Sequence, residues 1–192
     1  MPALKVWKEN SEDSSIDWRD LPGFVEVHDY WQSLRQSNDL PRAEDVDLLQ
    51  LLPWLPEISL FDRVKNDEII CRFVGTAIVD RLSHDISGKN IYPQQSAAMR
   101  DRTRDAFECM IKQPCGMVAH YTTHYNTGLH GAARTLYLPL IAPVNGFPRL
   151  LSIANREGKS DYAPPIEQSV IATDVVSITW IDVGFGMPQD RR

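Results

Sequence analysis

The sequence predicts an α+β fold, in which an antiparallel sheet carries its helices on one face. Strand-like runs rich in β-branched and aromatic residues fall into two blocks, and helical segments separate the blocks. Two strands, a helical crossover and a three-strand meander together give a five-stranded antiparallel sheet. The length of 192 residues suits one domain with short extensions.

The N-terminal region predicts a tail followed by an aromatic helix. Residues 1–20 are rich in Ser, Asp, Glu and Asn and are expected to form a flexible tail, and residues 21–187 a single domain. Within residues 23–38, helical spacing gathers a bulky stripe. This stripe must bury against the sheet of this domain or against a second copy of itself, and both remain open. Its candidate interface residues are Phe24, Val27, Tyr30, Trp31 and Leu34.

The segments that follow predict the remaining elements in order. A short helix after Asp45 is expected to stop at Pro53 and Pro56. The runs "EISLFDRV" and "EIICRFVGTAI" form a hairpin, and "TAIVDRLSHD" a short helix. The clearest long helix is "QQSAAMRDRTRDAFECMIKQ", whose apolar face includes Met99, Thr103 and Phe107. Three strands come next, and "EQSVIATDVVSITWIDVGFG" predicts another strand or an extended segment packed on the body.

Composition excludes several classes of function. A net charge of −6 and a pI near 5.3 argue against nucleic acid as a partner. The three cysteines have no C-x-x-C spacing, which favours a reducing compartment without disulfides. Neither a signal peptide nor a membrane-spanning run is present, so we expect a cytoplasmic protein with no membrane partner.

The stretch "HYTTHYNTGLHG" raises the question of a metal site at His120, His124 and His130. Its density of Val, Thr and Tyr predicts a strand. Residues four apart on a strand lie roughly 13 Å from each other, too far to share an ion bound at about 2 Å. His130 lies in the turn and could still approach one of the others across the strands, which keeps metal or haem binding open as an alternative.

The sequence contains none of three motifs that are typical of enzyme active sites or nucleotide-binding sites. No G-x-S-x-G, G-x-G-x-x-G or G-x-x-x-x-G-K-[ST] pattern occurs. The lone "SGKN" is typical of a helix-terminating glycine before a loop. We therefore expect a protein that is not an enzyme.

Several motifs together resemble the single-domain bacterial branch of the PAS sensor superfamily. They are a Leu-Pro segment before the first strand, "RFVGT" at residues 72–76, "DISGK" at residues 85–89, and Leu-Pro-Leu at residues 138–140. The resemblance covers residues 40–156, with "APVNGFP" as a longer hairpin turn than the family pattern. It implies a five-stranded antiparallel sheet with helices on one face and a pocket between them. In this pattern Gly75 would let the strand turn sharply into a helix capped by the Thr76 hydroxyl, and Gly88 would end a helical turn.

The resemblance also implies a sensory or regulatory role exerted through contact with another signalling protein or with a second copy of the chain. A small ligand in the pocket would gate that contact; the cofactor, if any, is unknown, and the reactive cysteine motif of flavin photosensors is absent. The pocket candidates are Tyr92, Met99, Arg102, Phe107, Tyr121 and Leu138. Two alternatives stay open: these side chains fill the core, as native packing favours, or the protein is a purely structural dimer.

Overall fold

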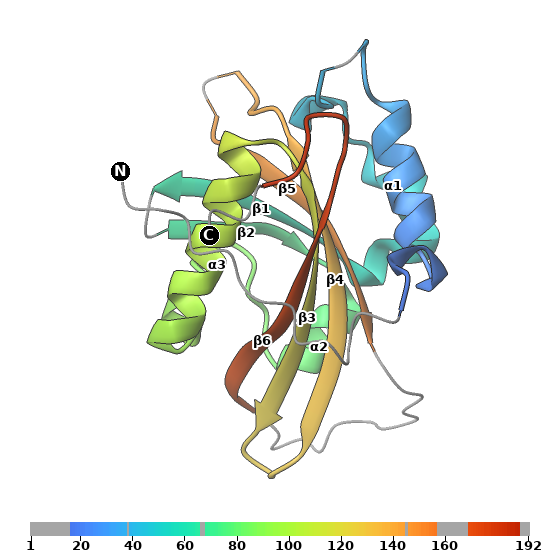
Figure 1. Cartoon of the computed structure of the whole chain (residues 1–192). Coiled ribbons are helices and arrows are strands. Elements are labelled where there is room, and N and C mark those ends of the chain that lie inside the picture. The colour runs from blue at the N-terminus through green and yellow to red at the C-terminus, as the bar shows by residue number, and fades with distance from the viewer. Residues whose placement is uncertain (1–15, 38, 66–67, 145, 157–168, 189–192) are drawn as a thin grey trace.

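One six-stranded sheet forms the centre of the molecule. The computed structural model describes residues 16–37, 39–65, 68–144, 146–156 and 169–188. The strands run in the order β2-β1-β5-β4-β3-β6, and every neighbouring pair is antiparallel (Figure 1). Their bounds are β1 Ile58–Lys65, β2 Glu68–Val74, β3 Gly116–Tyr125, β4 His130–Leu140, β5 Arg149–Arg156 and β6 Val170–Ile181.

Helices cover both faces of this sheet. The α-helices are α1 Phe24–Ser33, α2 Thr76–Leu82 and α3 Ala97–Lys112, and the 3-10 helices are η1 Trp18–Asp20, η2 Ala43–Asp45, η3 Leu48–Glu57 and η4 Tyr92–Gln94. Helices α1 and α3 lie on opposite sides of the sheet (Figure 1). Among the described residues, no helix is long and apolar enough to cross a membrane.

The α+β class and the antiparallel sheet are confirmed, with two differences. The C-terminal segment forms a sixth strand, β6, which pairs with β3 along nearly its whole length. The helices are not gathered on one face, because α1 packs on the face opposite α3. The expected tail of residues 1–20 lies mostly outside the described residues, and its described end includes η1.

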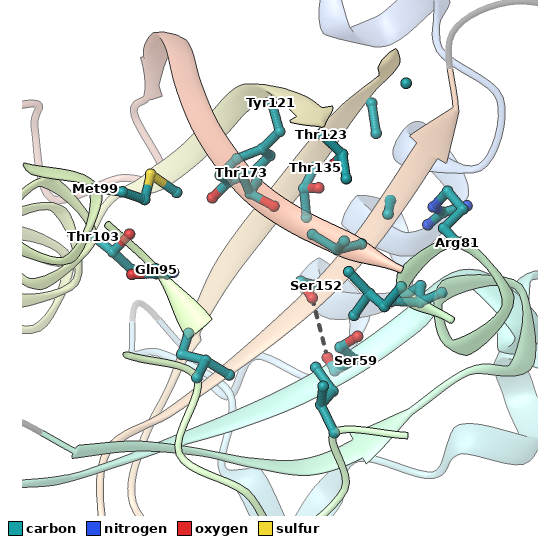
Figure 2. Close-up of a pocket in the computed structure, with 18 of the residues that line it drawn as sticks. Ser59, Arg81, Gln95, Met99, Thr103, Tyr121, Thr123, Thr135, Ser152 and Thr173 are labelled. Atoms are coloured by element: carbon teal, nitrogen blue, oxygen red, sulfur yellow. Dashed lines mark hydrogen bonds between the residues drawn. The ribbon is translucent and has the colours of Figure 1, made fainter. Parts of the chain in front are cut away.

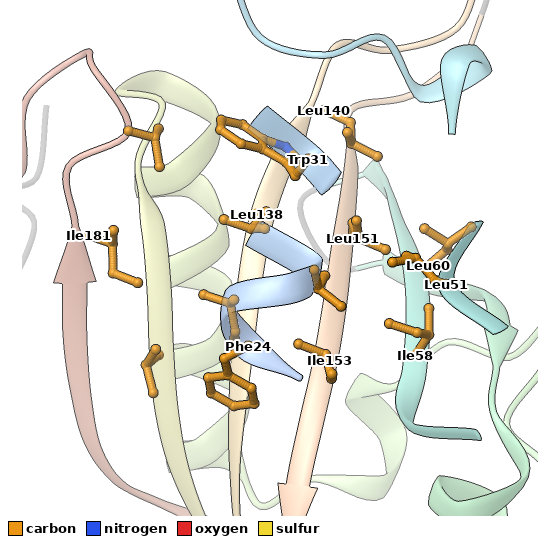
Figure 3. Packing of buried hydrophobic residues seen from close by; sticks show 14 of the residues in the cluster. Phe24, Trp31, Leu51, Ile58, Leu60, Leu138, Leu140, Leu151, Ile153 and Ile181 are labelled. Atoms are coloured by element: carbon orange, nitrogen blue, oxygen red, sulfur yellow. The ribbon is translucent and has the colours of Figure 1, made fainter. Parts of the chain in front are cut away.

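The aromatic stripe of α1 packs against the back of the sheet (Figure 3). Phe24, Val27 and Trp31 are fully buried within one chain. They belong to the same core as Leu138 and Ile153, and the indole Nε1 of Trp31 donates a 2.8 Å hydrogen bond to the carbonyl of Pro139. The sequence left open whether the stripe packs on the sheet of this domain, and these three side chains do pack on it. They could contact a partner only by leaving this core.

A second core lies on the front face, beneath α3. The rings of Phe61, Phe107 and Tyr137 meet there, with centroids 5.3 to 6.4 Å apart. Ile69 and Met110 are fully buried in the same cluster. Both faces of the central strands are therefore buried, and each strand contributes alternate side chains to the two sides.

A buried carboxylate ties three strands together at one end of the sheet. Asp62 of β1 is 3% exposed. It accepts hydrogen bonds from Arg149 Nε of β5 at 2.6 Å and from Arg72 Nε of β2 at 2.7 Å. Two cations offset the cost of burying this charge, so the pairing fixes β1 between its neighbours.

Gly75 connects the first hairpin to α2, and its role differs from the sequence expectation. Its φ of −72° is ordinary for any residue, and α2 has no side-chain cap from Thr76. A Cβ at Gly75 would lie 2.2 Å from the carbonyl oxygen of Pro56 and 2.3 Å from that of Leu55. The glycine is required because the backbone of η3 passes so close to it. Pro53 and Pro56 lie inside η3 rather than at its end, contrary to the expectation from the sequence.

We predict that Gly75→Ala lowers the free energy of unfolding by about 2–3 kcal/mol, because backbone must move to admit the methyl group. Gly88→Ala is the matched control: its φ is +72° but no atom lies within 4 Å of the added Cβ. That control should cost only about 1 kcal/mol, from the backbone conformation alone. Urea unfolding of the three proteins measures both values, and equal losses would contradict the close-approach explanation.

Candidate functional site

A cavity of about 490 Å³ lies between the front face of the sheet and α3. Parts of α2, the segment around η4 and the first residues of β6 also border it (Figure 2). The alternative that these side chains fill the core completely is therefore wrong for this region. The space is of the size that small-molecule sites in proteins occupy.

Four strands supply the floor of the cavity through the alternation of the pleat. Ser59 of β1, Ser152 of β5 and Thr135 of β4 are buried polar residues that line it. Tyr121 of β3 and Tyr137 of β4 extend the floor toward α3. On each strand, the residues next to these in sequence point to the opposite core. The polar character therefore belongs to the front face.

Helix α3 supplies the roof. Met99, Thr103 and Phe107 follow one another at a spacing of four residues and all line the cavity. Each is at most 5% exposed. The helix begins at Ser96, whose hydroxyl accepts a 3.2 Å hydrogen bond from the Met99 amide. This cap starts α3 at the cavity wall, which places the stripe over the sheet.

Most polar groups around the cavity have partners within the protein. The hydroxyls of Tyr121 and Tyr137 lie 3.0 Å apart. Arg81 forms a two-point ion pair with Glu57 outside the lining, at 2.7 and 2.9 Å. The Ser152 hydroxyl donates to the Ser59 carbonyl at 3.3 Å.

Two oxygen atoms at the α3 side of the cavity differ from the rest. Thr103 Oγ1 and Gln95 Oε1 are buried, and neither forms a hydrogen bond with any described residue. Thr103 is 5% exposed. Buried polar atoms in native proteins are almost always paired with protein, water or ligand.

The structure brings together three of the six predicted pocket residues. Met99, Phe107 and Tyr121 line the cavity. The amphipathic long helix predicted from the sequence accounts for the first two, and the strand predicted at "HYTTHYNTGLHG" accounts for the third.

The other three predicted pocket residues lie elsewhere. Leu138 is fully buried in the core beneath α1, because the pleat turns it away from its neighbour Tyr137. Tyr92 is 2% exposed and packs in the front core beside the cavity, while its neighbours Ile91 and Pro93 form the lining. Arg102 faces β6, where its Nη1 donates a 2.8 Å hydrogen bond to the Val175 carbonyl.

The prediction from the sequence missed the polar lining residues. Thr103 carried a signal, since it is the one hydroxyl residue on the otherwise apolar face of the long helix. Gln95 had none, because it lies in the connection that precedes the helix. Thr135, Tyr137 and Ser152 would have required the facing direction of their strands, which an apolar run does not reveal.

The histidines are arranged as the strand assignment requires. His120 and His124 are on β3, and His130 lies directly opposite His124 on β4. The rings of His124 and His130 meet edge to face with centroids 4.7 Å apart, and His124 Nε2 lies 3.0 Å from Asp174 Oδ2. Within the described residues, no group of three or more His, Cys, Asp or Glu side chains could hold a metal ion.

The described lining of the cavity contains no cysteine. Burial raises the pKa of the Cys71 thiol to about 12. A hydrogen bond between Cys115 and Cys109 raises the pKa of Cys115 and lowers that of Cys109, contrary to the raised value that apolar surroundings predict for Cys109. The described lining residues therefore offer no thiol that could form a covalent adduct with a molecule in the cavity.

Comparison with known proteins agrees with the fold. A family model described as "PAS domain" matches residues 20–154. The chain therefore belongs to the PAS domain family, whose members are sensory and regulatory modules. No curated protein matches the chain.

Two solved structures are similar in backbone. The light-state structure of the blue-light photoreceptor Aureochrome1 LOV matches with a TM-score of 0.39 and 13% identity, covering 61% of this chain and 93% of that one. A fungal LOV domain photoreceptor matches with a TM-score of 0.42 and 14% identity, covering 69% of this chain and 90% of that one.

The tyrosine pair predicts a loss of stability in alkali. Burial raises the pKa of Tyr137 from 10.0 to about 12. The pKa of Tyr121 is raised in the same direction, first by desolvation and then by Tyr137. Above pH 10 the unfolded chain ionises while the folded chain stays neutral, so the free energy of unfolding should fall by up to about 1.4 kcal/mol per pH unit for each tyrosine.

Urea unfolding between pH 9 and about pH 12 measures this slope. Tyr137→Phe removes one ionising group and should make the decline shallower. A variant with the same slope as the wild type would show that the decline comes from other groups.

Proposed function

We propose that the protein is a non-enzymatic PAS-type sensory module that binds a small molecule in the cavity and signals through contact with another protein. The observation that carries this proposal is the cavity of about 490 Å³ with buried hydroxyl and amide oxygens in its wall. A cavity that served only packing would be apolar and empty. Polar groups placed in an apolar chamber are typical of sites that orient a ligand.

Occupancy of the cavity would reach the surface through β6. Val170, Ile171 and Thr173 of this strand line the cavity. Among the described strands, β6 pairs with β3 alone and so forms one edge of the sheet. A molecule in the cavity therefore touches a strand whose other edge is open to partners.

A second link joins α3 to the same strand. Arg102 of α3 donates its hydrogen bond to Val175 beside a bulge, where the pairing with β3 shifts register between His120 and Tyr121. A shift of α3 over a bound molecule would move this contact. Bulged strands adjust more easily than regular ones, so β6 suits the output end of the module.

The partner surface is proposed to include exposed apolar residues of β6 and the outer side of α1. Ile171 is 66% exposed and Val176 38% exposed. Tyr30 and Leu34 of the predicted interface remain partly exposed beside the buried stripe. A homodimer or a complex with a signalling protein in the cytoplasm would cover these side chains. Light scattering of the purified protein reports the oligomeric state.

The decisive experiment is a fluorescence titration with N-phenyl-1-naphthylamine, an uncharged probe of apolar sites. We expect saturable binding at one site in the wild type. Ala133→Phe places a ring into the cavity from β4 and should weaken binding at least about tenfold by occupying the ligand volume. Hydrogen exchange of the β6 amides should also slow when the probe is bound.

Ala98→Phe is the matched control, since Ala98 is an exposed residue of α3 and outside the cavity lining. It should bind the probe as the wild type does, and circular dichroism shows whether both variants fold. Absence of saturable binding, or equal losses in the two variants, would rule out the cavity as a ligand site.

A further inference from the structure

The polar atoms of the cavity that lack partners lie on one side of it. Thr103 Oγ1 comes from the second turn of α3 and Gln95 Oε1 from the connection before that helix. Figure 2 shows both beside Met99, away from the hydrogen-bonded Ser59 and Ser152. Leaving such an atom buried without a partner costs about 1–3 kcal/mol, so each of these positions favours a bound group.

The charged residues of the lining offer nothing to an ionised ligand. Arg81 is held by both oxygens of Glu57. His84 Nδ1 lies 2.8 Å from the Leu82 carbonyl. Both side chains are at the α2 side of the lining rather than beside Thr103. A carboxylate or phosphate at the α3 side would be desolvated, and the described lining residues on that side supply no cation to pair with it.

The two oxygens differ in what they require. The amide oxygen of Gln95 accepts hydrogen bonds only, whereas the Thr103 hydroxyl both donates and accepts. An ether or ester oxygen could accept from Thr103 but would leave Gln95 Oε1 without a partner. A hydroxyl donates to Gln95 and accepts from Thr103, and an uncharged NH2 group donates one N–H to each, so either head group serves both atoms at once.

Much of the remaining lining is apolar. Ile78, Leu82, Ile86, Ile91 and Phe107 contribute hydrocarbon surface around the space. Burial of a matching apolar surface on a ligand would supply most of the binding free energy. The polar atoms would then decide orientation and selectivity.

We propose that the cavity takes an uncharged molecule with an apolar body and a hydroxyl or NH2 head group, which donates a hydrogen bond to Gln95 Oε1 and forms a second one with Thr103 Oγ1. This inference rests on the proposed function, because it names the class of ligand for the same cavity. The head group replaces the hydrogen bonds that the two oxygens lack within the protein.

Three probes of similar size and different head groups test this selectivity. 1-Octanol donates and accepts, heptyl methyl ether accepts only, and octanoate is an anion. Isothermal titration should show 1-octanol binding about fivefold more tightly than the ether, the ratio expected for one additional hydrogen bond. Octanoate should bind more weakly than either.

Variants identify the atoms responsible. Gln95→Met removes the acceptor at nearly constant volume, so 1-octanol should lose its preference over the ether. Thr103→Val removes the hydroxyl from which both head groups accept a hydrogen bond, so it should weaken 1-octanol and the ether alike, while Thr103→Ser should retain the wild-type affinities. Thr179→Val, at an exposed position of β6, is the matched control and should change neither affinity.

The ligand-free proteins supply an independent readout. Because Thr103→Val replaces an unpaired buried hydroxyl by a methyl group, its melting temperature should rise above that of the wild type. A hydroxyl that serves packing through an internal hydrogen bond would give the opposite sign. This measurement needs no probe and also shows that the variant folds.

The outcomes separate this inference from the proposed function. Equal affinities for 1-octanol and the ether would leave the cavity as a ligand site but would overturn the requirement for a head group that donates a hydrogen bond. Water would then be the partner of the two oxygens. Tighter binding of octanoate would overturn the exclusion of anions. Failure of all three probes to bind would overturn both proposals, because the apolar cavity itself would then be closed.

Discussion

Burial of the sheet on both faces is the constraint on which the rest of this structure depends. Side chains of a strand alternate between faces, so each central strand must satisfy two different cores at once. In β4, Leu136 and Leu138 meet α1 while Thr135 and Tyr137 meet the cavity and α3. A slip of one residue in register would exchange the two sets and place hydroxyls beneath the apolar stripe of α1.

The cavity follows from the difference between the two faces. The back face is packed with Leu and Ile against Trp31 and Phe24. The front face carries Ser59, Thr135 and Ser152, whose short side chains do not reach the roof formed by α3. Small polar residues on a buried face thus create both the volume and the polar lining.

Local periodicity predicted most of the elements but not their facing directions. The long helix, the first hairpin and the three-strand meander could be assigned because each repeats apolar residues at its own period. The run from Leu136 to Ile141 is almost uniformly apolar, so it contains no alternation to show that Leu138 faces α1. The apolar stripe of α1 presented the same difficulty, because its residues do not show whether the stripe packs on the sheet or on another molecule. Those choices are made by tertiary packing.

The part of the cavity wall formed by β6 lies outside the family match. That match ends at residue 154, whereas β6 spans Val170–Ile181 and contributes three residues to the lining. The other walls come from elements within the matched region. Strand β6, which completes the wall of the cavity, is also an edge strand of the sheet, and Arg102 links it to α3. Because β6 both borders the cavity and forms an edge of the sheet, a ligand in the cavity would, under the proposed function, alter the surface offered to a partner without a separate transmitting element.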